Sequence, residues 1–291
     1  MQYGFSIKRK CYLLSVLLMT VWLTGCVQEE FESTPSPAGN GIRFTLTVPD
    51  VNLPSVSSRT MTGTGTAKKE DEIETVDILV FDMSKTPAVF LEWASATGVT
   101  QDLADNSTVS FSAVLSPTTA STCIVVVANK ELDGIVSGFT KGVTTKVRAM
   151  EEMLHTQTGK WLADGSTTGG YTRIPMYGEK VISKITPSMD PITGINMKRM
   201  LARIDIRNSA SNFMVEEVYL ANYNTTGYIA PAWNTNGQVT EPAPDTPVLP
   251  TGSGKMTEEG NAILYSVNGN TPYDGEIYTF ESLAAGDAGG A

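Results

Sequence analysis

The sequence predicts a mainly β protein made of antiparallel β-sandwich domains, with one short helix in the first of them. Short runs of alternating or continuously apolar residues recur along the chain, and glycine, proline and polar residues separate them. Apolar residues at helical spacing occur in one segment, which begins at Thr144. The 291 residues suffice for one large domain or two ordinary ones.

The first 25 residues are predicted to be a signal peptide. A basic cluster at residues 8–10 precedes a short apolar run at residues 12–22, which is shorter than the roughly 20 residues that a permanent membrane span needs. The run closes with Leu-Thr-Gly-Cys at residues 23–26, which resembles the lipobox of bacterial lipoproteins. The alternative is an ordinary cleaved secretory signal.

The lipobox resemblance implies that the peptide bond between Gly25 and Cys26 is cut and that Cys26 is lipidated. Two or three acyl chains such as palmitate would anchor the protein stably without a transmembrane helix, because each buried methylene adds roughly 0.8 kcal/mol of membrane affinity. The acidic residues at positions 29, 30 and 32 resemble a signal that sends some Bacteroidetes lipoproteins to the outer face of the outer membrane.

Charge and composition limit the possible partners. The signal peptide contains three basic and no acidic residues, so its removal changes the net charge from −10 to −13, which argues against a nucleic-acid partner. Residues 26–40 are rich in proline, serine and glycine, and they are predicted to be a flexible linker. Cys123 would be the one cysteine left besides Cys26, which excludes an internal disulfide; it is expected to be a small buried side chain.

The first predicted strand covers Ile42 to Val48. Its strict alternation puts four apolar side chains on one face: Ile42, Phe44, Leu46 and Val48. Pro49 ends the strand, and residues 50–72 are predicted to be a long exposed loop that contains Arg59.

Nine further segments complete the expected strands. We place a domain boundary near Lys198, which gives an N-terminal domain at residues 41–198 and a C-terminal domain at residues 199–291. The turn-like tail at residues 284–291 follows the last strand directly, so the second domain is expected to be incomplete through truncation. The predicted strands are residues 73–82, 89–93, 108–115, 122–128, 174–182, 192–208, 214–223, 262–267 and 276–280.

The predicted helix has Thr144 as its N-cap. Its apolar face, which includes Met150 and Met153, is expected to fill the core, and Lys146 is expected on the opposite, polar side. His155, the single histidine of the chain, follows at the helix end and is expected to be structural or exposed to solvent.

Few residues suggest catalysis or ligand binding. The single histidine has no acidic partner nearby in the sequence, which disfavours a catalytic triad, and no nucleotide-binding or zinc-protease motif occurs; no cofactor, metal or enzymatic activity is predicted. The weak candidates are carboxylates for glycoside hydrolysis (Asp77, Asp82, Glu92), calcium ligands (Asp102, Asp105, Asn106) and aromatic residues that could stack on sugars (Trp161, Tyr171, Tyr177, Tyr223, Tyr228, Trp233).

The order of the motifs along the chain resembles the FimA-type fimbrillin family of Bacteroidales type V pili. The resemblance rests on the lipobox, the alternating strand at residues 42–48, the loop sequence Ser-Ser-Arg-Thr at residues 57–60, and the strands at residues 74–82 and 201–206. It covers nearly the whole chain.

The resemblance implies two transthyretin-like β-sandwich domains and assembly by strand exchange. A lipidated precursor would reach the cell surface, where a trypsin-like protease cuts between Arg59 and Thr60. The strand with Ile42, Phe44, Leu46 and Val48 would then leave, exposing an unpaired sheet edge and an apolar slot that a strand of the next fimbrial subunit fills. The resulting fimbria would support adhesion.

Two other functions remain open at this point. The chain could be an anchor or tip subunit that keeps both its lipid and its first strand, or a carbohydrate-binding surface lipoprotein. Arg43 is the second candidate for the protease site, although a strand is a poor protease substrate. The exchange hypothesis would be contradicted if the strand at residues 42–48 were central in its sheet, flanked on both sides and inaccessible to exchange.

Overall fold

The computed structural model describes residues 41–48, 70–101, 108–162, 172–206, 212, 214–242, 247–251, 255–256, 262–266 and 273–282. They are mainly β, with two short helices among them. Within this part of the chain, no helix combines the length and the apolar character needed to cross a membrane.

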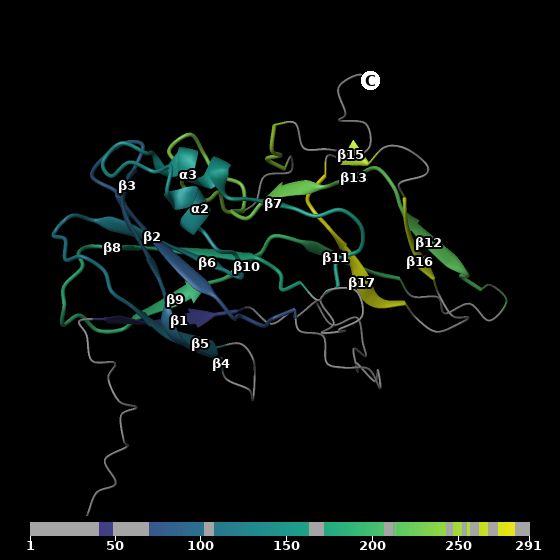
Figure 1. Ribbon diagram of the computed structural model, residues 1–291, viewed down its shortest axis with the longest axis horizontal. Coiled ribbons are helices and arrows are strands. Elements are labelled where there is room, and N and C mark those ends of the chain that lie inside the picture. Colours follow the sequence, from purple (N-terminus) through teal and green to yellow (C-terminus); the bar gives the residue numbers. More distant parts are fainter. Residues whose placement is uncertain are drawn as a thin grey trace, which may run out of the picture. The chain divides into compact units, whose positions relative to one another are not determined.

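Two sheets form a sandwich. The four-stranded sheet has the order β4 (Thr97–Gln101), β5 (Thr108–Ala113), β1 (Ile42–Thr47), β9 (Ile192–Asn196). The five-stranded sheet has the order β10 (Lys198–Arg199), β8 (Met176–Ile182), β6 (Thr122–Ala128), β2 (Val76–Asp82), β3 (Val89–Ser95). Figure 1 shows the layer with β1 and β5 against the layer with β2, β6 and β8. The β-sandwich predicted for the first part of the chain is present, but it is not purely antiparallel, because β9 pairs in parallel with β1.

The core between the two sheets consists of alternate side chains from both. Phe44 and Leu46 of β1 face Ile78 of β2 and Ile124 of β6 within one apolar cluster. Gly178 of β8 lets the layers approach closely, because a methyl group there would lie 2.7 Å from Met197 Sδ and 2.8 Å from Ile195 Cγ2. The close approach fixes β9 and therefore the sheet that contains β1.

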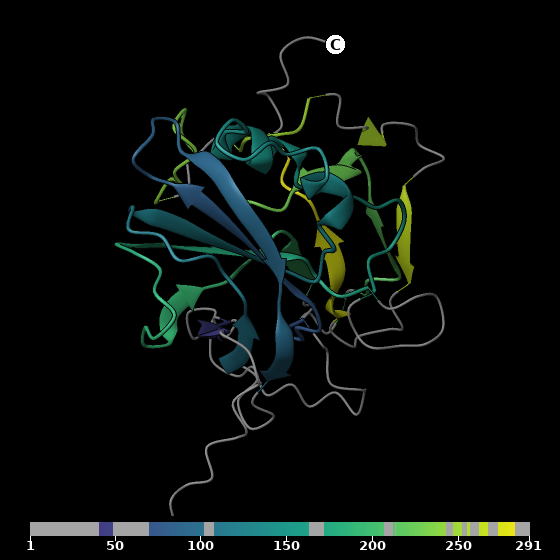
Figure 2. The same cartoon turned by 60° about the vertical axis from the view of Figure 1, so that its left-hand side comes forward.

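Two helices cover the other face of the five-stranded sheet. They are α2 (Asp133–Val136) and α3 (Lys146–Glu152), and Figure 2 shows both on the side of β2 that faces away from β1. Met150 and Met153 pack with Leu79 of β2 and Val125 of β6, as predicted for core-filling methionines. With both faces covered, β6 is buried at every position, which explains its continuous apolar sequence.

The helical prediction needs three corrections. The N-cap of α3 is Thr145 and not Thr144: its side chain accepts a hydrogen bond from Arg148 N at 3.2 Å. Lys146 is buried and not on the polar side, because its Nζ lies 2.6 Å from Glu179 Oε2 of β8. The short helix α2 lacks amphipathic length and was not predicted.

The residues after β10 form pairs of strands. The pairs are β11 (Ala202–Ile206) with β17 (Tyr273–Thr279), β12 (Glu217–Leu220) with β16 (Ile263–Ser266), β13 (Tyr223–Asn224) with β15 (Lys255–Met256), and β14 (Thr226–Tyr228) with β7 (Leu154–Thr156). A smaller apolar cluster, which includes Ile263, Tyr265 and Ile277, holds the first two pairs together. The division into domains at residue 198 stays a prediction.

His155 lies in β7 and not at the end of a helix. Its ring packs against Trp161 with the centroids 4.9 Å apart, and it pairs through the backbone with Gly227 of β14. Burial, with a smaller contribution from the charge of Lys130, lowers the pKa of His155 to about 4. The side chain is therefore neutral at pH 7, and its expected structural role is supported by these contacts.

The lowered pKa of His155 predicts a pH-dependent stability. The unfolded chain takes up a proton near pH 6.5 while the folded chain resists it until about pH 4, so the contribution of His155 is complete above pH 6.5 and is lost between pH 6.5 and 4. Allowing for solvent screening, we expect a loss of about 1–2 kcal/mol that His155→Gln removes. Urea unfolding at pH 7 and pH 4.5 measures it; equal pH dependence in both proteins would contradict the assignment.

Candidate functional site: the first strand and its groove

The inward side chains of β1 are buried as the sequence predicts. Ile42, Phe44, Leu46 and Val48 are between 0% and 3% exposed, and the outward residues Arg43 and Thr47 are exposed. Phe44 stacks on Phe111 of β5, with ring centroids 5.0 Å apart and an interplanar angle of 7°. Each apolar side chain of this size contributes roughly 1.5–3 kcal/mol on burial, so β1 supplies a substantial part of the core.

β1 lies between two neighbouring strands. On one side it pairs antiparallel with β5 over six consecutive positions, from Ile42 opposite Ala113 to Thr47 opposite Thr108. On the other side it pairs in parallel with β9, with a shift of register between Phe44 and Leu46. Removal of β1 would therefore leave a groove with an apolar floor, bounded by the unpaired edges of β5 and β9. The sequence analysis expected a single unpaired edge.

The pairing bears directly on strand exchange. Two flanking strands meet the first part of the condition that would contradict it, namely that the strand is central. The second part of the condition is that the strand is inaccessible to exchange, and this depends on how easily its pairing with β5 and β9 opens. The irregular parallel pairing with β9 is the weaker of the two sides, because parallel pairs are slightly less stable per residue and the register shift interrupts the ladder.

The protease candidates differ in their surroundings. Arg43 is exposed, but its backbone is paired with Ser112 in the middle of the β1–β5 ladder, where a protease cannot bind it in extended form. Arg59 and Thr60 lie outside the described residues, as do Gly25 and Cys26. The pairing of Arg43 makes it a poor protease site, and for this reason Arg59 stays the preferred candidate.

A buried acidic anchor follows the segment that contains Arg59. Glu70 is 6% exposed and accepts hydrogen bonds from Arg203 Nη1 and from the Tyr278 hydroxyl, each at 2.5 Å. The neighbouring Asp71 pairs with Arg199. The chain just before β2 is thus fixed to β10 and β11 by two ion pairs and to β17 by the hydrogen bond from Tyr278.

The sequence analysis missed this anchor. Residues 68–72 are strongly polar and were predicted to end an exposed loop, because a charge run is usually solvated. The available signal was the spacing of Arg199 and Arg203, which places both cations on the same face of the predicted strand. Nothing local identifies their carboxylate partners, which lie more than 120 residues away in the sequence.

The carboxylates considered for glycoside hydrolysis have separate structural roles. Asp77 accepts hydrogen bonds from Ser95 Oγ and Leu132 N, and Glu92 accepts them from Ser116 N and Oγ. Asp82 accepts from Ser84 N at 2.8 Å, and its hydrogen bonds to Ser84 lower its pKa. Asp77 and Asp82 lie at the two ends of one strand, about 16 Å apart, so they do not form a catalytic pair.

Metal binding and thiol chemistry find little support. Among the described residues, no group of three or more His, Cys, Asp or Glu side chains could hold a metal ion. The calcium candidates Asp102, Asp105 and Asn106 lie outside those residues. Cys123 is buried as predicted, and burial raises its pKa to about 12, so the thiol is not a nucleophile at neutral pH.

Three of the six aromatic candidates are buried and cannot stack on a sugar. Trp161, Tyr177 and Tyr223 are buried, and Tyr171 lies outside the described residues. The hydroxyl of Tyr177 donates to Glu179, and burial raises its pKa. Tyr228 and Trp233 are half-buried and pack edge to face with their centroids 4.8 Å apart. Among the five candidates that the structure describes, these two have partly exposed side chains.

Comparison with known proteins identifies the family. The sequence profile of the family described as major fimbrial subunit protein (FimA) matches residues 42–197, which is more than half of the chain. The chain belongs to this family. The match begins at the first residue of β1 and ends at Met197, just after β9, so it covers every strand of the two sandwich sheets except β10. Members of the FimA family are structural fimbrial subunits and not enzymes, and the membership implies a cell-surface fimbria polymerised from such subunits.

Three solved structures are similar over much of the chain. A fimbrial assembly protein from Parabacteroides distasonis has 11% identity and a TM-score of 0.42, covering 85% of this chain and 78% of its own. A protein assigned to cell adhesion from the same organism has 17% identity and a TM-score of 0.45, with 86% and 73% covered. A Bacteroides thetaiotaomicron protein assigned to polysaccharide binding has 12% identity and a TM-score of 0.32, with 65% and 60% covered. No curated protein matches the chain.

The burial of β1 predicts how the FimA-family sandwich responds to substitutions in this strand. Phe44→Ala removes the stack on Phe111 and leaves a cavity, so we expect the free energy of unfolding to fall by about 3–5 kcal/mol. Arg43→Ala, on the exposed face of the same strand, should change it by no more than about 0.5 kcal/mol. Denaturant unfolding measures both, and similar effects of the two substitutions would show that β1 is not packed as described.

Proposed function

We propose that the chain is a structural subunit of a cell-surface fimbria, exported as a lipidated precursor and assembled by protease-triggered strand exchange. The observation that carries this proposal is the position of β1. It fills a groove between β5 and β9 with four buried side chains, and it is joined to β2 only through the segment at residues 49–75.

In this proposal the lipid retains the precursor at the outer membrane. The signal peptide is cut between Gly25 and Cys26, and acyl chains attach to Cys26. Two or more chains hold a protein stably at a bilayer, whereas one chain gives marginal binding. The linker at residues 26–40 then separates the folded domains from the membrane surface.

The cut between Arg59 and Thr60 changes how β1 is held. Before the cut, β1 belongs to the same chain as β2, so a departed strand returns at a high effective concentration. After the cut, only non-covalent contacts retain it, and a strand of another subunit competes on equal terms. The acidic anchor at Glu70 and Asp71 holds the downstream side of the cut in place, so the fragment that leaves is the one that contains β1.

The exchange fits the two edges of the groove. The incoming strand would pair with β5 and β9 as β1 does, and its alternate apolar side chains would pack on Phe111, Ile78 and Ile124. The two-domain division at residue 198 belongs to this proposal, with the residues after 198 attached to the sandwich partly through the acidic anchor. The assembled filament supports adhesion.

An anchor or tip subunit is the second candidate. The observation that favours it is how firmly β1 is held: β1 is flanked by strands on both sides, and its inward side chains are almost completely buried. A subunit that keeps such a strand, together with the lipid on Cys26, would end a filament at the membrane or at its tip.

Limited trypsin treatment of the lipidated full chain tests the proposal. We expect a new N-terminus at Thr60, loss of the fragment that begins at Cys26, and then ladders of polymers on gels. Arg59→Gln should abolish the Thr60 terminus, and it should also abolish the ladders when Lys68 and Lys69, after which trypsin can cut as well, are replaced by glutamine. Arg43→Gln should leave both unchanged. A blocked Cys26 terminus with no polymers after treatment would contradict the stalk-subunit function and support the anchor.

A further inference from the structure

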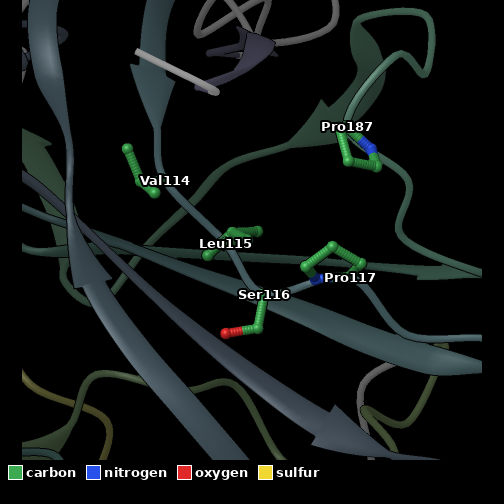
Figure 3. A pocket seen from close by; sticks show the side chains of 5 residues that line it. All are labelled: Val114, Leu115, Ser116, Pro117 and Pro187. Atoms are coloured by element: carbon green, nitrogen blue, oxygen red, sulfur yellow. The ribbon is translucent and has the colours of Figure 1, made fainter.

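An open pocket lies beyond the N-terminal end of β1. It has a volume of about 280 Å³ and is lined by Val114, Leu115, Ser116, Pro117 and Pro187. Figure 3 shows the first four following one another along the chain after β5, with Pro187 on a separate segment above Pro117. Most of its lining is aliphatic, and it has no part in the exchange groove as described so far.

The pocket continues the groove along the register of β1. Ile42 lies opposite Ala113, so the two preceding positions of a longer strand would lie opposite Val114 and then Leu115. The alternation of β5 persists there: Val114 is 66% exposed and Leu115 is 6% exposed. A side chain two positions before Ile42 would therefore point inward, beside Leu115.

The pocket is held in shape by neighbouring contacts. Glu92 accepts hydrogen bonds from Ser116 N at 2.7 Å and from Ser116 Oγ at 2.6 Å, which fixes the turn after β5. Thr118 and Ile185 exchange backbone hydrogen bonds of 3.0 and 2.8 Å, which ties the two segments that form the walls. A preformed pocket requires little ordering when a ligand enters.

The chain's own sequence does not offer the pocket an aliphatic side chain. The two residues before Ile42 are Asn40 and Gly41 in the sequence, so neither supplies an aliphatic side chain. A strand with leucine, isoleucine or valine there would bury apolar surface that the native segment cannot bury.

We propose that this pocket is an additional subsite for the incoming strand of a neighbouring fimbrial subunit, and that it accepts an aliphatic side chain two positions ahead of the residue that replaces Ile42. This inference rests on the proposed strand exchange, with the incoming strand in the direction of β1. The subsite gives the incoming strand an advantage over β1, so that exchange proceeds towards polymer once the chain is cut.

Peptide binding to the cut full chain tests the subsite. The full chain is treated with trypsin, the protease is inhibited, and three fluorescent peptides are added. They are residues 40–48 as they stand, the same peptide with Asn40→Leu, and a control with Thr45→Leu, whose extra leucine points outward opposite Ser110 and away from the pocket. We expect the Asn40→Leu peptide to bind about tenfold more tightly than the other two, as partial burial of one leucine side chain predicts. The Leu115 methyl signals in NMR should shift with this peptide more than with the other two.

The outcomes separate the subsite from the exchange itself. Equal binding of all three peptides would overturn the subsite and leave strand exchange supported. Equal gains from both leucine peptides would also overturn it, since they would reflect general hydrophobicity. Failure of every peptide to bind would overturn strand exchange, and the subsite with it.

Discussion

The packing of β1 between β5 and β9 is the constraint on which the sandwich depends. Its four inward side chains complete the apolar layer between the sheets, and the stack of Phe44 on Phe111 joins it to β5. The layer would lose its continuity without a strand at this position, because β5 and β9 would each present unpaired backbone groups to a groove with an apolar floor. The sandwich therefore needs a strand here, although nothing in the pairing requires that it come from the same chain.

This requirement connects the fold with assembly in the FimA family. A strand that is essential to the core and joined to the rest through a long connection can be replaced only when the connection is cut, because the intact chain returns its own strand rapidly. The acidic anchor fixes the chain just before β2 to β10, β11 and β17, so the contacts on the downstream side of the proposed cut do not depend on β1. The pocket at Leu115 would add a preference for a foreign strand.

The sequence predicted the sandwich where the local pattern and the tertiary environment agree. The alternation of β1 matches a strand that is buried on one face, and the continuous apolar run of β6 matches a strand that is buried on both faces. The strand β4 was missed because it is polar, although it pairs with the next strand, β5. The strands β7, β14 and β15 were missed because they have only two or three residues and pair with strands far away in the sequence. The predicted segment 192–208 is divided into β9, β10 and β11, which belong to three different sheets.

The parts of the site that the sequence could not supply are long-range contacts. Lys146 reads as a solvent-facing residue of an amphipathic helix, and only the position of Glu179 on β8 explains its burial. The acidic anchor has the same origin, since Glu70 meets Arg203 and Tyr278 only after the strands after residue 198 have packed. The inward set of β1 was predictable, but its place between two strands was not, because alternation identifies a buried face and gives no information about neighbours.

A reversible covalent lock on β1 tests the central claim most directly. Thr45 lies opposite Ser110 in the β1–β5 ladder, and opposed residues of antiparallel strands are close enough for a disulfide. In the Thr45→Cys, Ser110→Cys protein, we expect polymer formation after proteolysis to be absent under oxidising conditions and restored by reductant, with either single substitution forming polymers in both conditions. Polymers formed by the oxidised, locked protein would show that β1 does not leave its groove during assembly, and the account would be wrong.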